Sequence, residues 1–308
     1  MSQSFKLLDV FVRWLFSRPG NEQILLAFLN AVMRDAKETE LAAVKVLNPF
    51  NPGEYKGEKE FILDVAAKDS HGRLFDFEIQ SYREEDYAKR AFDYWARLHA
   101  SQLRKGDDYL DVHPTVGVHL CDYNNHPEIA EGHLVVDATF RGHPDILASD
   151  DFQLHFVELP KYYDRSGKGG LSDLEKWAVW FTFEPEKDDT MSDRPWLPED
   201  LRDDPQFIDL EKQYREFCTD EELRYIAESR FRFITDVANE KSWARRHGFA
   251  EGKEQGLAEG RAEGKAEGRA EGIRERDLEI ASKMKARGMA AAEIADFTGL
   301  SLAVVEEL

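Results

Sequence analysis

Residues 61–80, FILDVAAKDSHGRLFDFEIQ, are the feature that most constrains how this chain can fold. Two apolar runs, 61–68 and 73–80, flank a short polar segment, and this pattern predicts a β-hairpin. Each run carries an acid, Asp64 in the first and Glu78 in the second. A carboxylate inside paired apolar strands costs free energy unless its charge is compensated. A divalent cation bound at the hairpin would compensate both charges.

The length of the turn decides which side chains share a face, because side chains alternate along a strand. If residues 70–72 form a three-residue loop with glycine in the left-handed conformation, Asp64 lies opposite Glu78. Gln80 then lies on the same face. A loop one residue shorter or longer would place Asp64 and Glu78 on opposite faces. Mg²⁺ usually binds one or two carboxylates together with water and phosphate, so this register predicts a magnesium site.

The spacing Asp64-x13-Glu78-x-Gln80 resembles the catalytic core of the PD-(D/E)XK nucleases. Glutamine in place of lysine is similar to the recombination-promoting nuclease/putative transposase family of that superfamily. Residues 9–16, DVFVRWLF, resemble this family's D-x-x-F-K-x-x-F helix, with Val12 replacing an aromatic residue and Arg13 replacing lysine. Further similar segments follow in the family's order, at 28–30, 90–102, 109–120 and 157–161, so the likeness covers nearly the whole chain.

The resemblance implies an α/β fold with a restriction-endonuclease-like mixed central sheet flanked by helices, followed by a helical C-terminal tail. It also implies a function: Mg²⁺-dependent endonuclease activity on DNA, with low sequence specificity and a link to recombination or mobile elements. Mn²⁺ would serve as a substitute metal. The alternative is a non-catalytic interaction or oligomerisation module built on a nuclease-derived fold.

The same resemblance assigns roles to individual residues. Asp64 and Glu78 would hold the metal, and Gln80 would orient the attacking water without adding positive charge. Asp9 is a further catalytic candidate, since the first helix of such proteins commonly lends an acid, although Asp9 could equally be the N-cap of its helix. Asp76 shares the face of Glu78 and could be a ligand in its own right or support one.

Nucleic-acid contacts are expected on the helix predicted over residues 84–103 and just after it. Four residues there are candidates for contacting DNA: Arg90, Tyr94, Arg97 and Arg104. The formal net charge of −20 argues against tight, passive binding to DNA. The charge is uneven, however, because residues 83–105 hold six bases and four acids whereas residues 184–222 hold fifteen acids and five bases. The acidic segment is expected to point away from DNA or to regulate access to it.

The remaining pattern is that of an α/β protein with helices before and after a set of strands. Apolar spacing predicts helices over 5–16, 22–34, 171–183, 209–217 and 220–246, and strands over 115–121, 132–140 and 153–159. Residues 43–47 are ambiguous and could form a strand. No Gly-x-Gly-x-x-Gly, P-loop or Gly-x-Ser-x-Gly motif occurs, which argues against dinucleotide, ATP and hydrolase chemistry of those types.

A glycine recurs at every fourth position from Gly248 to Gly272. Each interior glycine costs a helix about 1 kcal/mol relative to alanine, so two interpretations stand: a flexible or partly helical linker, or a self-associating helix. The division expected is a nuclease-like domain over 1–247, this segment over 248–272, and a small helical unit over 273–308. The last unit resembles a helix-turn-helix, but a docking role is equally consistent with its lack of bases near the C-terminus.

The chain has no basic-then-apolar leader pattern and no apolar run near the ~18 residues that a membrane span needs. We therefore expect a cytoplasmic protein that does not associate with membranes. From the resemblance we expect DNA as its partner, and from the C-terminal pattern a homo-oligomer formed through residues 248–308.

Overall fold

The computed structural model describes residues 5–48, 64–83, 87–183 and 197–308. The chain separates into two compact units, Met1–Thr235 and Asp236–Leu308. The three-part division expected from the sequence, with boundaries after residues 247 and 272, stays a prediction. The hairpin and all the candidate site residues lie in the first unit.

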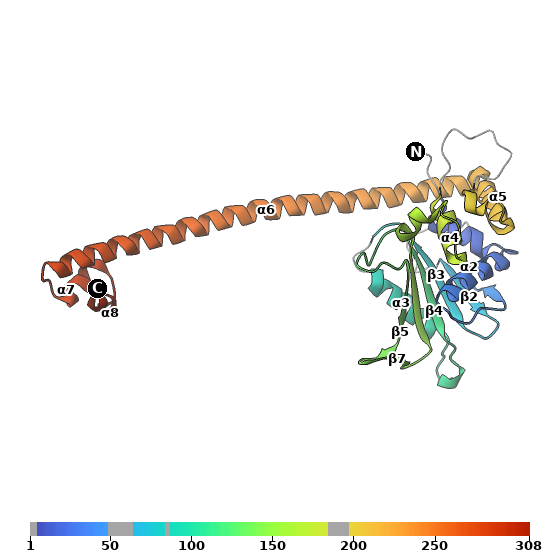
Figure 1. The fold of residues 1–308 in the computed structure, drawn as a ribbon, viewed down its shortest axis with the longest axis horizontal. Coiled ribbons are helices and arrows are strands. Elements are labelled where there is room, and N and C mark those ends of the chain that lie inside the picture. The colour runs from blue at the N-terminus through green and yellow to red at the C-terminus, as the bar shows by residue number, and fades with distance from the viewer. Residues whose placement is uncertain (1–4, 49–63, 84–86, 184–196) are drawn as a thin grey trace. The chain divides into compact units, whose positions relative to one another are not determined.

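A mixed six-stranded sheet forms the centre of the first unit, with the strand order β1-β2-β3-β4-β8-β5 (Figure 1). The pairs β3–β4 and β4–β8 are parallel, whereas β1–β2, β2–β3 and β5–β8 are antiparallel. The strands are β1 (Val44–Val46), β2 (Val65–Asp69), β3 (Leu74–Gln80), β4 (Thr115–Cys121), β5 (His133–Asp137) and β8 (Phe152–Glu158). A separate two-stranded sheet pairs β6 (Thr139–Phe140) with β7 (His143–Leu147).

One face of the sheet is covered by α1 (Asp9–Ser17), α2 (Glu22–Asp35) and α4 (Asp173–Thr182). The core on this side is rich in aromatic side chains. Phe28, for example, contacts Phe77 of the sheet and Trp177 of α4, with ring centroids 4.8 and 5.3 Å away. Helix α5 (Pro205–Thr219) adds Phe207 and Phe217 to the same core. This core provides most of the apolar burial that stabilises the unit.

Helix α3 (Tyr87–Ala100) lies on the opposite face of the sheet (Figure 1). It contributes Tyr87 and Ala91 to a smaller core with Leu154 and Phe156 of β8. After Leu74, the side chains of β3 on this face are polar: Asp76, Glu78 and Gln80. The short 3-10 helices η2 (Tyr109–Asp111), η3 (Leu159–Arg165) and η4 (Glu199–Leu201) lie in the connections.

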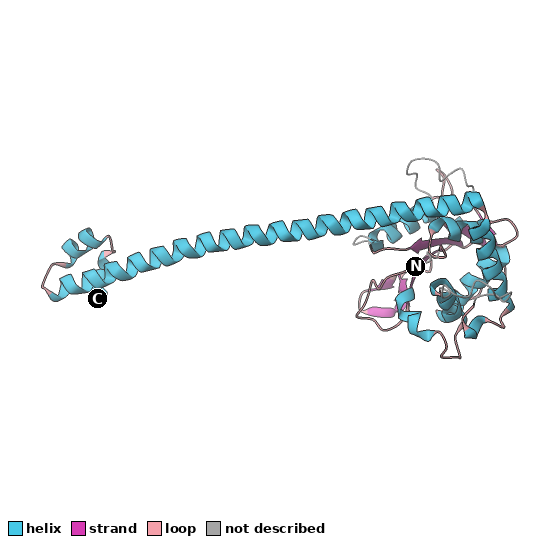
Figure 2. Cartoon of the chain, turned by 90° about the horizontal axis from the view of Figure 1, so that it is seen from above, coloured by secondary structure: helices cyan, strands magenta, loops and turns pink. Residues whose placement is uncertain are grey.

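Helix α6 (Glu221–Ala286) spans 66 residues without interruption and includes the whole glycine-periodic segment (Figure 2). Its last two turns pack with α7 (Ala291–Thr298) and α8 (Leu302–Glu307) around Ala281, Ile294 and Val305. The ammonium of Lys285 donates to the carbonyls of Val305 and Glu306, at 3.0 and 2.9 Å, and so caps the C-terminal end of α8. Residues 273–308 are therefore mostly helical, as the sequence predicts.

The fold predicted from the resemblance is confirmed, since a mixed sheet flanked by helices precedes a long C-terminal helix. The ambiguous segment at 43–47 contains strand β1, whereas β7 was not predicted. Part of the predicted strand, residues 61–63, lies outside the described residues, as does the start of the predicted helix at 84–86. Within the described part of the chain, no helix has the length and apolar character required to cross a bilayer.

Candidate active site

The register of the β2–β3 hairpin is the one that the sequence predicts. Val65 pairs with Phe77 and Lys68 with Leu74, so residues 70–72 form the three-residue loop and the next pair outward is Asp64 opposite Glu78. The backbone N–H of Asp64 donates to Oε1 of Glu78 at 3.0 Å. The two acids therefore lie on the α3 face of the sheet, and the strand alternation adds Asp76 and Gln80 to that face.

Two residues determine the turn that sets this register. Gly72 has φ +92°, the left-handed conformation that glycine adopts without strain, and a Cβ there would lie 2.6 Å from the His113 ring. The carboxylate of Asp69 accepts from the backbone N–H groups of His71 and Arg73, both at 2.9 Å. It also forms an ion pair with the Arg73 guanidinium at 2.7 Å. The turn is thus held by its own side chains.

Asp64 and Glu78 are both buried, and each is held by the backbone of the other strand. Oδ2 of Asp64 accepts from the Ile79 N–H at 2.9 Å, which complements the bond from the Asp64 N–H to Glu78. In each of the two carboxyls, one oxygen accepts this backbone hydrogen bond. The carboxyls are therefore oriented by the hairpin backbone rather than by mobile side chains.

Asp76 is fully buried beside these two acids, and neither of its oxygens has a hydrogen-bond donor among the described residues. Burial raises the pKa of Asp76 well above its usual range, and the charge of Asp64 adds to the effect. Burial likewise raises the pKa of Glu78, together with the charges of Asp64 and Asp76. Burial raises the pKa of Asp64 to about 7, and the charge of Asp9 contributes. Each of these three buried carboxyls therefore keeps its proton to a higher pH than an exposed acid would, unless a cation replaces the proton.

Gln80 contacts an arginine from the next helix. Its Oε1 accepts from Nη2 of Arg90 at 2.7 Å, and its Nε2 donates to the carbonyl of Tyr82 at 3.2 Å. The guanidinium of Arg90 also lies over the rings of Tyr87 and Tyr94, with its central carbon 5.2 and 5.5 Å from the ring centroids. The sequence predicts that Gln80 orients water, but its amide is engaged with Arg90.

Tyr94 is half-buried on the same side of α3. Burial raises the pKa of its hydroxyl to about 12, and the negative charges of Glu78, Asp64 and Asp76 act in the same direction. Those charges act on the tyrosine because it lies beside the acid site. The structure thus brings Arg90 and Tyr94, two of the four predicted DNA contacts, to the acids.

The other two predicted DNA contacts lie away from the acids. Arg97 is exposed and forms an ion pair with Asp93 one helical turn earlier, at 2.8 Å. Arg104 is exposed and lies beyond the end of α3, in a turn where its N–H donates to Asp107 at 2.7 Å. Both side chains remain candidates for contacting a DNA backbone, but neither belongs to the acid site.

Asp9 is the first residue of α1 and is close enough to Asp64 for its charge to affect that acid. The prediction that Asp9 could be the N-cap is wrong, because the N-cap residue is Leu8 and no side chain caps the helix. Instead, both oxygens of Asp9 contact Arg230 of α6, Oδ1 with Nε at 3.0 Å and Oδ2 with Nη2 at 2.7 Å. An arginine 221 residues away therefore neutralises this acid in part.

Arg13 is, like Arg230, a residue near the acids that sequence reasoning did not select. It is buried one helical turn after Asp9, and its charge lowers the pKa of Asp64, opposing the dominant effect of burial. Residues four apart on a helix lie on the same side. The spacing of Asp9 and Arg13 could therefore have indicated that both point toward the acids.

The donor set at the hairpin suits a hard divalent cation, because it consists of carboxylate oxygens and includes two that have no donor among the described residues. Within the described ranges, no group of three or more His, Cys, Asp or Glu side chains is arranged so that it could hold a metal ion. A cation held here would thus need water, a backbone carbonyl or a substrate phosphate to complete its coordination. Mg²⁺ is usually bound in this way.

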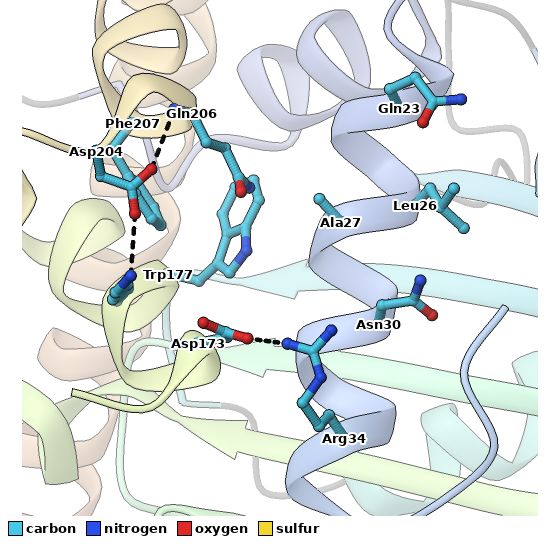
Figure 3. A pocket seen from close by; sticks show the side chains of 11 residues that line it. Gln23, Leu26, Ala27, Asn30, Arg34, Asp173, Trp177, Asp204, Gln206 and Phe207 are labelled. Carbon is cyan, nitrogen blue, oxygen red and sulfur yellow. Dashed lines mark hydrogen bonds and ion pairs between the residues drawn. The ribbon is translucent and has the colours of Figure 1, made fainter. Parts of the chain in front are cut away.

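A separate cavity of about 360 Å³ opens between α2, α4 and the start of α5 (Figure 3). None of the hairpin acids lines it. Its basic side chains are already paired: Arg34 with Asp173, and Lys176 with Asp204 at 3.0 Å. Because its charges are balanced within the protein, this cavity shows no arrangement for catalysis.

Comparison with known proteins agrees with the fold. A family model described as "PD-(D/E)XK nuclease family transposase" matches residues 6–244 of the 308. No curated protein and no solved structure matches significantly. The match covers the hairpin, α3 and the helices that pack on the sheet. The chain therefore belongs to the family of PD-(D/E)XK nuclease family transposases, as the sequence resemblance predicts.

Proposed function

We propose that this protein is a metal-dependent endonuclease that hydrolyses phosphodiester bonds of DNA. The observation that carries the proposal is the set of three buried carboxyls on one face of the hairpin, Asp64, Asp76 and Glu78. Asp76 has no hydrogen-bond donor among the described residues. An isolated buried carboxylate is so unfavourable that it takes up a proton or acquires a cation. A cation bound here would take the place of these protons and compensate the charge of the carboxylates.

Asp64 and Glu78 are the proposed ligands of Mg²⁺, with Mn²⁺ as a substitute, and Asp76 supports them or joins them. Such a cation, when bound, lowers the pKa of a coordinated water and polarises the phosphate. In the hydrolysis itself, a bond forms between the water oxygen and phosphorus, and the bond from phosphorus to the leaving oxygen breaks. The leaving oxygen gains a proton, and the water loses one to solvent.

The remaining site residues would act on the substrate by position and charge. Gln80 and Asp9 are proposed members of the catalytic site, Asp9 as an acid whose charge is moderated by Arg230. Arg90 and Tyr94 would contact the phosphate at the site. Arg97 and Arg104, which are exposed, would contact the DNA backbone farther away. Backbone contacts carry no sequence information, which is consistent with low sequence specificity.

The cellular setting proposed is recombination or the movement of mobile elements, in the cytoplasm. The word "transposase" in the family description supports this setting. The net charge of −20 means that the protein needs a local basic surface and a cation to approach DNA.

Nicking of a supercoiled plasmid tests the proposal. We expect nicking in Mg²⁺ or Mn²⁺, none in EDTA, and loss of activity in Asp64→Ala. Asp145→Ala is the matched control, because Asp145 is an exposed acid of β7. Equal activity of wild type and Asp64→Ala would show that the site is assigned wrongly. Absence of activity with both metals, together with no metal binding by calorimetry, would favour the non-catalytic interaction module.

We also propose that residues 248–308 assemble the protein into a homo-oligomer. Every residue of the glycine-periodic part of α6 is exposed, including Phe249 and Leu257. Exposed apolar side chains on a long helix favour contact with a second helix. Light scattering of the full chain and of a chain ending at His247 tests this. The full chain should have the larger oligomeric mass, and equal subunit numbers would contradict the assembly role.

A further inference from the structure

The acid site has a glutamine where nucleases of this superfamily usually place a lysine, so position 80 contributes no positive charge. The structure places a positive charge directly against that glutamine, since Nη2 of Arg90 donates to Oε1 of Gln80 at 2.7 Å. Arg90 comes from α3, not from the hairpin. The charge of Arg90 also acts on the acids. It lowers the pKa of Glu78, whereas burial, the dominant effect, raises that pKa.

The orientation of the Gln80 amide is determined by its two partners. The Tyr82 carbonyl can only accept, so Nε2 must face it, and the bond measures 3.2 Å. Oε1 must then face Arg90, which can only donate. Gln80 is buried, so water does not compete strongly for its amide. The glutamine is thus built to receive an arginine rather than to turn toward a water molecule.

Two aromatic rings also contact the Arg90 guanidinium. Its central carbon lies 5.2 Å from the centroid of Tyr87 and 5.5 Å from that of Tyr94. Tyr87 is itself fixed, because it is buried and its hydroxyl contacts Nδ1 of His119 at 2.9 Å. A planar guanidinium is suited to lie over such rings, and its fork of N–H groups matches phosphate oxygens in a way that a lysine ammonium does not.

We propose that Gln80 is a positioning residue for Arg90, and that Arg90 is the catalytic residue that brings positive charge to the scissile phosphate. This inference rests on the proposed nuclease function. As the water oxygen bonds to phosphorus and the leaving oxygen departs, negative charge grows on the non-bridging oxygens. A guanidinium held in place beforehand stabilises that charge without reorganising. Arg90 donates hydrogen bonds in this step and transfers no proton.

A double-variant cycle on the full-length protein tests the inference by two measurements. One is the turnover number for plasmid nicking in Mg²⁺. The other is the affinity for a fluorescein-labelled 20-base-pair DNA duplex in Ca²⁺, measured by anisotropy at several salt concentrations. Arg224→Ala is the matched control, since it removes an exposed arginine of α6. It should leave both measurements unchanged.

We expect Arg90→Ala to lower turnover by about 10²-fold and Gln80→Ala by about tenfold. Gln80→Ala should have no further effect once Arg90 is absent. Gln80→Lys combined with Arg90→Ala should recover at least about tenfold over Arg90→Ala, because the lysine restores the charge. Arg90→Ala should also reduce the salt slope of DNA binding by about one. Arg90→Lys, which keeps the charge but not the planar fork, gives intermediate turnover and replaces Arg90→Ala should that variant fail to fold.

Multiplicative losses in the Gln80→Ala/Arg90→Ala variant, or no recovery by the lysine variant, would overturn the inference and leave the nuclease function standing. A wild-type protein inactive in both Mg²⁺ and Mn²⁺ would overturn the nuclease function. In that case the inference is tested by the affinities for DNA. Non-additive effects of Gln80→Ala and Arg90→Ala on affinity support the positioning of Arg90 by Gln80, and additive effects overturn it.

Discussion

The two faces of strand β3 are built from alternating residues of one segment and have opposite properties. Phe75, Phe77 and Ile79 point into the aromatic core beneath α1, α2 and α4. Asp76, Glu78 and Gln80 point to the α3 side, and they too are buried. Burial of each phenylalanine stabilises the fold by roughly 1.5–3 kcal/mol, whereas burial of each carboxylate opposes folding.

This contrast explains how the site can be held in an unfavourable state. A strand that packed only weakly on its apolar face would move its acids toward water, where their charges cost less. The aromatic contacts of Phe77 prevent this, because its ring centroid lies 5.2 Å from that of Phe16 and 4.8 Å from that of Phe28. The apolar packing on one face offsets the cost of holding buried acids on the other face.

The largest effect is expected from Glu78→Gln, which changes the acid face alone. The amide has nearly the same shape but no charge to attract a cation. Nicking in Mg²⁺ should fall by roughly 10³-fold, equivalent to about 4 kcal/mol in the barrier, while the protein stays folded. Initial rates together with calorimetric titration of Mg²⁺ measure this. A loss below tenfold would remove Glu78 from the metal site.

The neighbouring substitution Phe77→Ala tests the apolar face. It should lower the free energy of unfolding by about 3–5 kcal/mol, because it leaves a cavity among Phe16 and Phe28. Urea unfolding followed by circular dichroism measures the change. Folded Phe77→Ala should still bind Mg²⁺, in contrast to Glu78→Gln. A destabilisation below about 1 kcal/mol would mean that this face does not hold the hairpin in place.

Asp64→Asn should change how the stability of the protein depends on pH, because it removes one titrating group from the acid face. The pKa of Asp64 is raised from 3.8 to about 7, so without metal its protonated form favours folding. This contribution is complete below about pH 4 and is lost as pH rises through 7. In EDTA at pH 8, Asp64→Asn should therefore be more stable than wild type by about 4 kcal/mol, and the difference should vanish near pH 4.

Thermal unfolding across pH, with and without Mg²⁺, measures this prediction. Mg²⁺ should stabilise wild type at pH 8 more than at pH 5, because protons and the cation compete for the same oxygens. Asp145→Asn, an exposed acid, should show neither effect. Stability of wild type in EDTA that rises from pH 5 to 8 relative to Asp64→Asn would contradict the assigned direction.

The smallest effect is expected from Gly72→Ala in the turn that sets which residues share a face. The left-handed backbone costs alanine about 1–2 kcal/mol, and contact with the His113 ring adds to this. Gly142→Ala is the matched control, because Gly142 has φ +86° and no heavy atom lies within 4 Å of where its added methyl group would be. Chemical unfolding should show Gly72→Ala as the more destabilised of the two. Equal losses would mean that the His113 ring moves aside freely.

Much of the fold follows from local rules that the sequence displays. Strand β4 covers the predicted 115–121, and the helices at 22–35 and 173–182 lie within a few residues of their predicted bounds. The register of the hairpin was predictable as well, because the length of the loop determines which side chains share a face. Asp64, Glu78 and Gln80 could therefore be placed together from their spacing alone.

Contacts between distant segments could not be predicted in this way. Nothing in the spacing of residues indicates that Arg230 forms an ion pair with Asp9, or that the Gln80 amide turns to Arg90. Such contacts depend on the path of α3 and α6, which the packing of whole helices determines. Asp9 is not the N-cap because the helix begins at Asp9 itself, and its carboxylate contacts a helix remote in sequence instead.

The sequence by itself thus determined the hairpin, its parity, the acids on one face and the family resemblance, because strand alternation and turn length are local properties. Only the tertiary structure decided how those acids are compensated: Asp76 is left without a donor among the described residues, Asp9 is paired with Arg230, and Arg90 is seated on Gln80. The physical reason is that burial and charge pairing depend on every element packed around a group. Neighbours in the chain do not specify them.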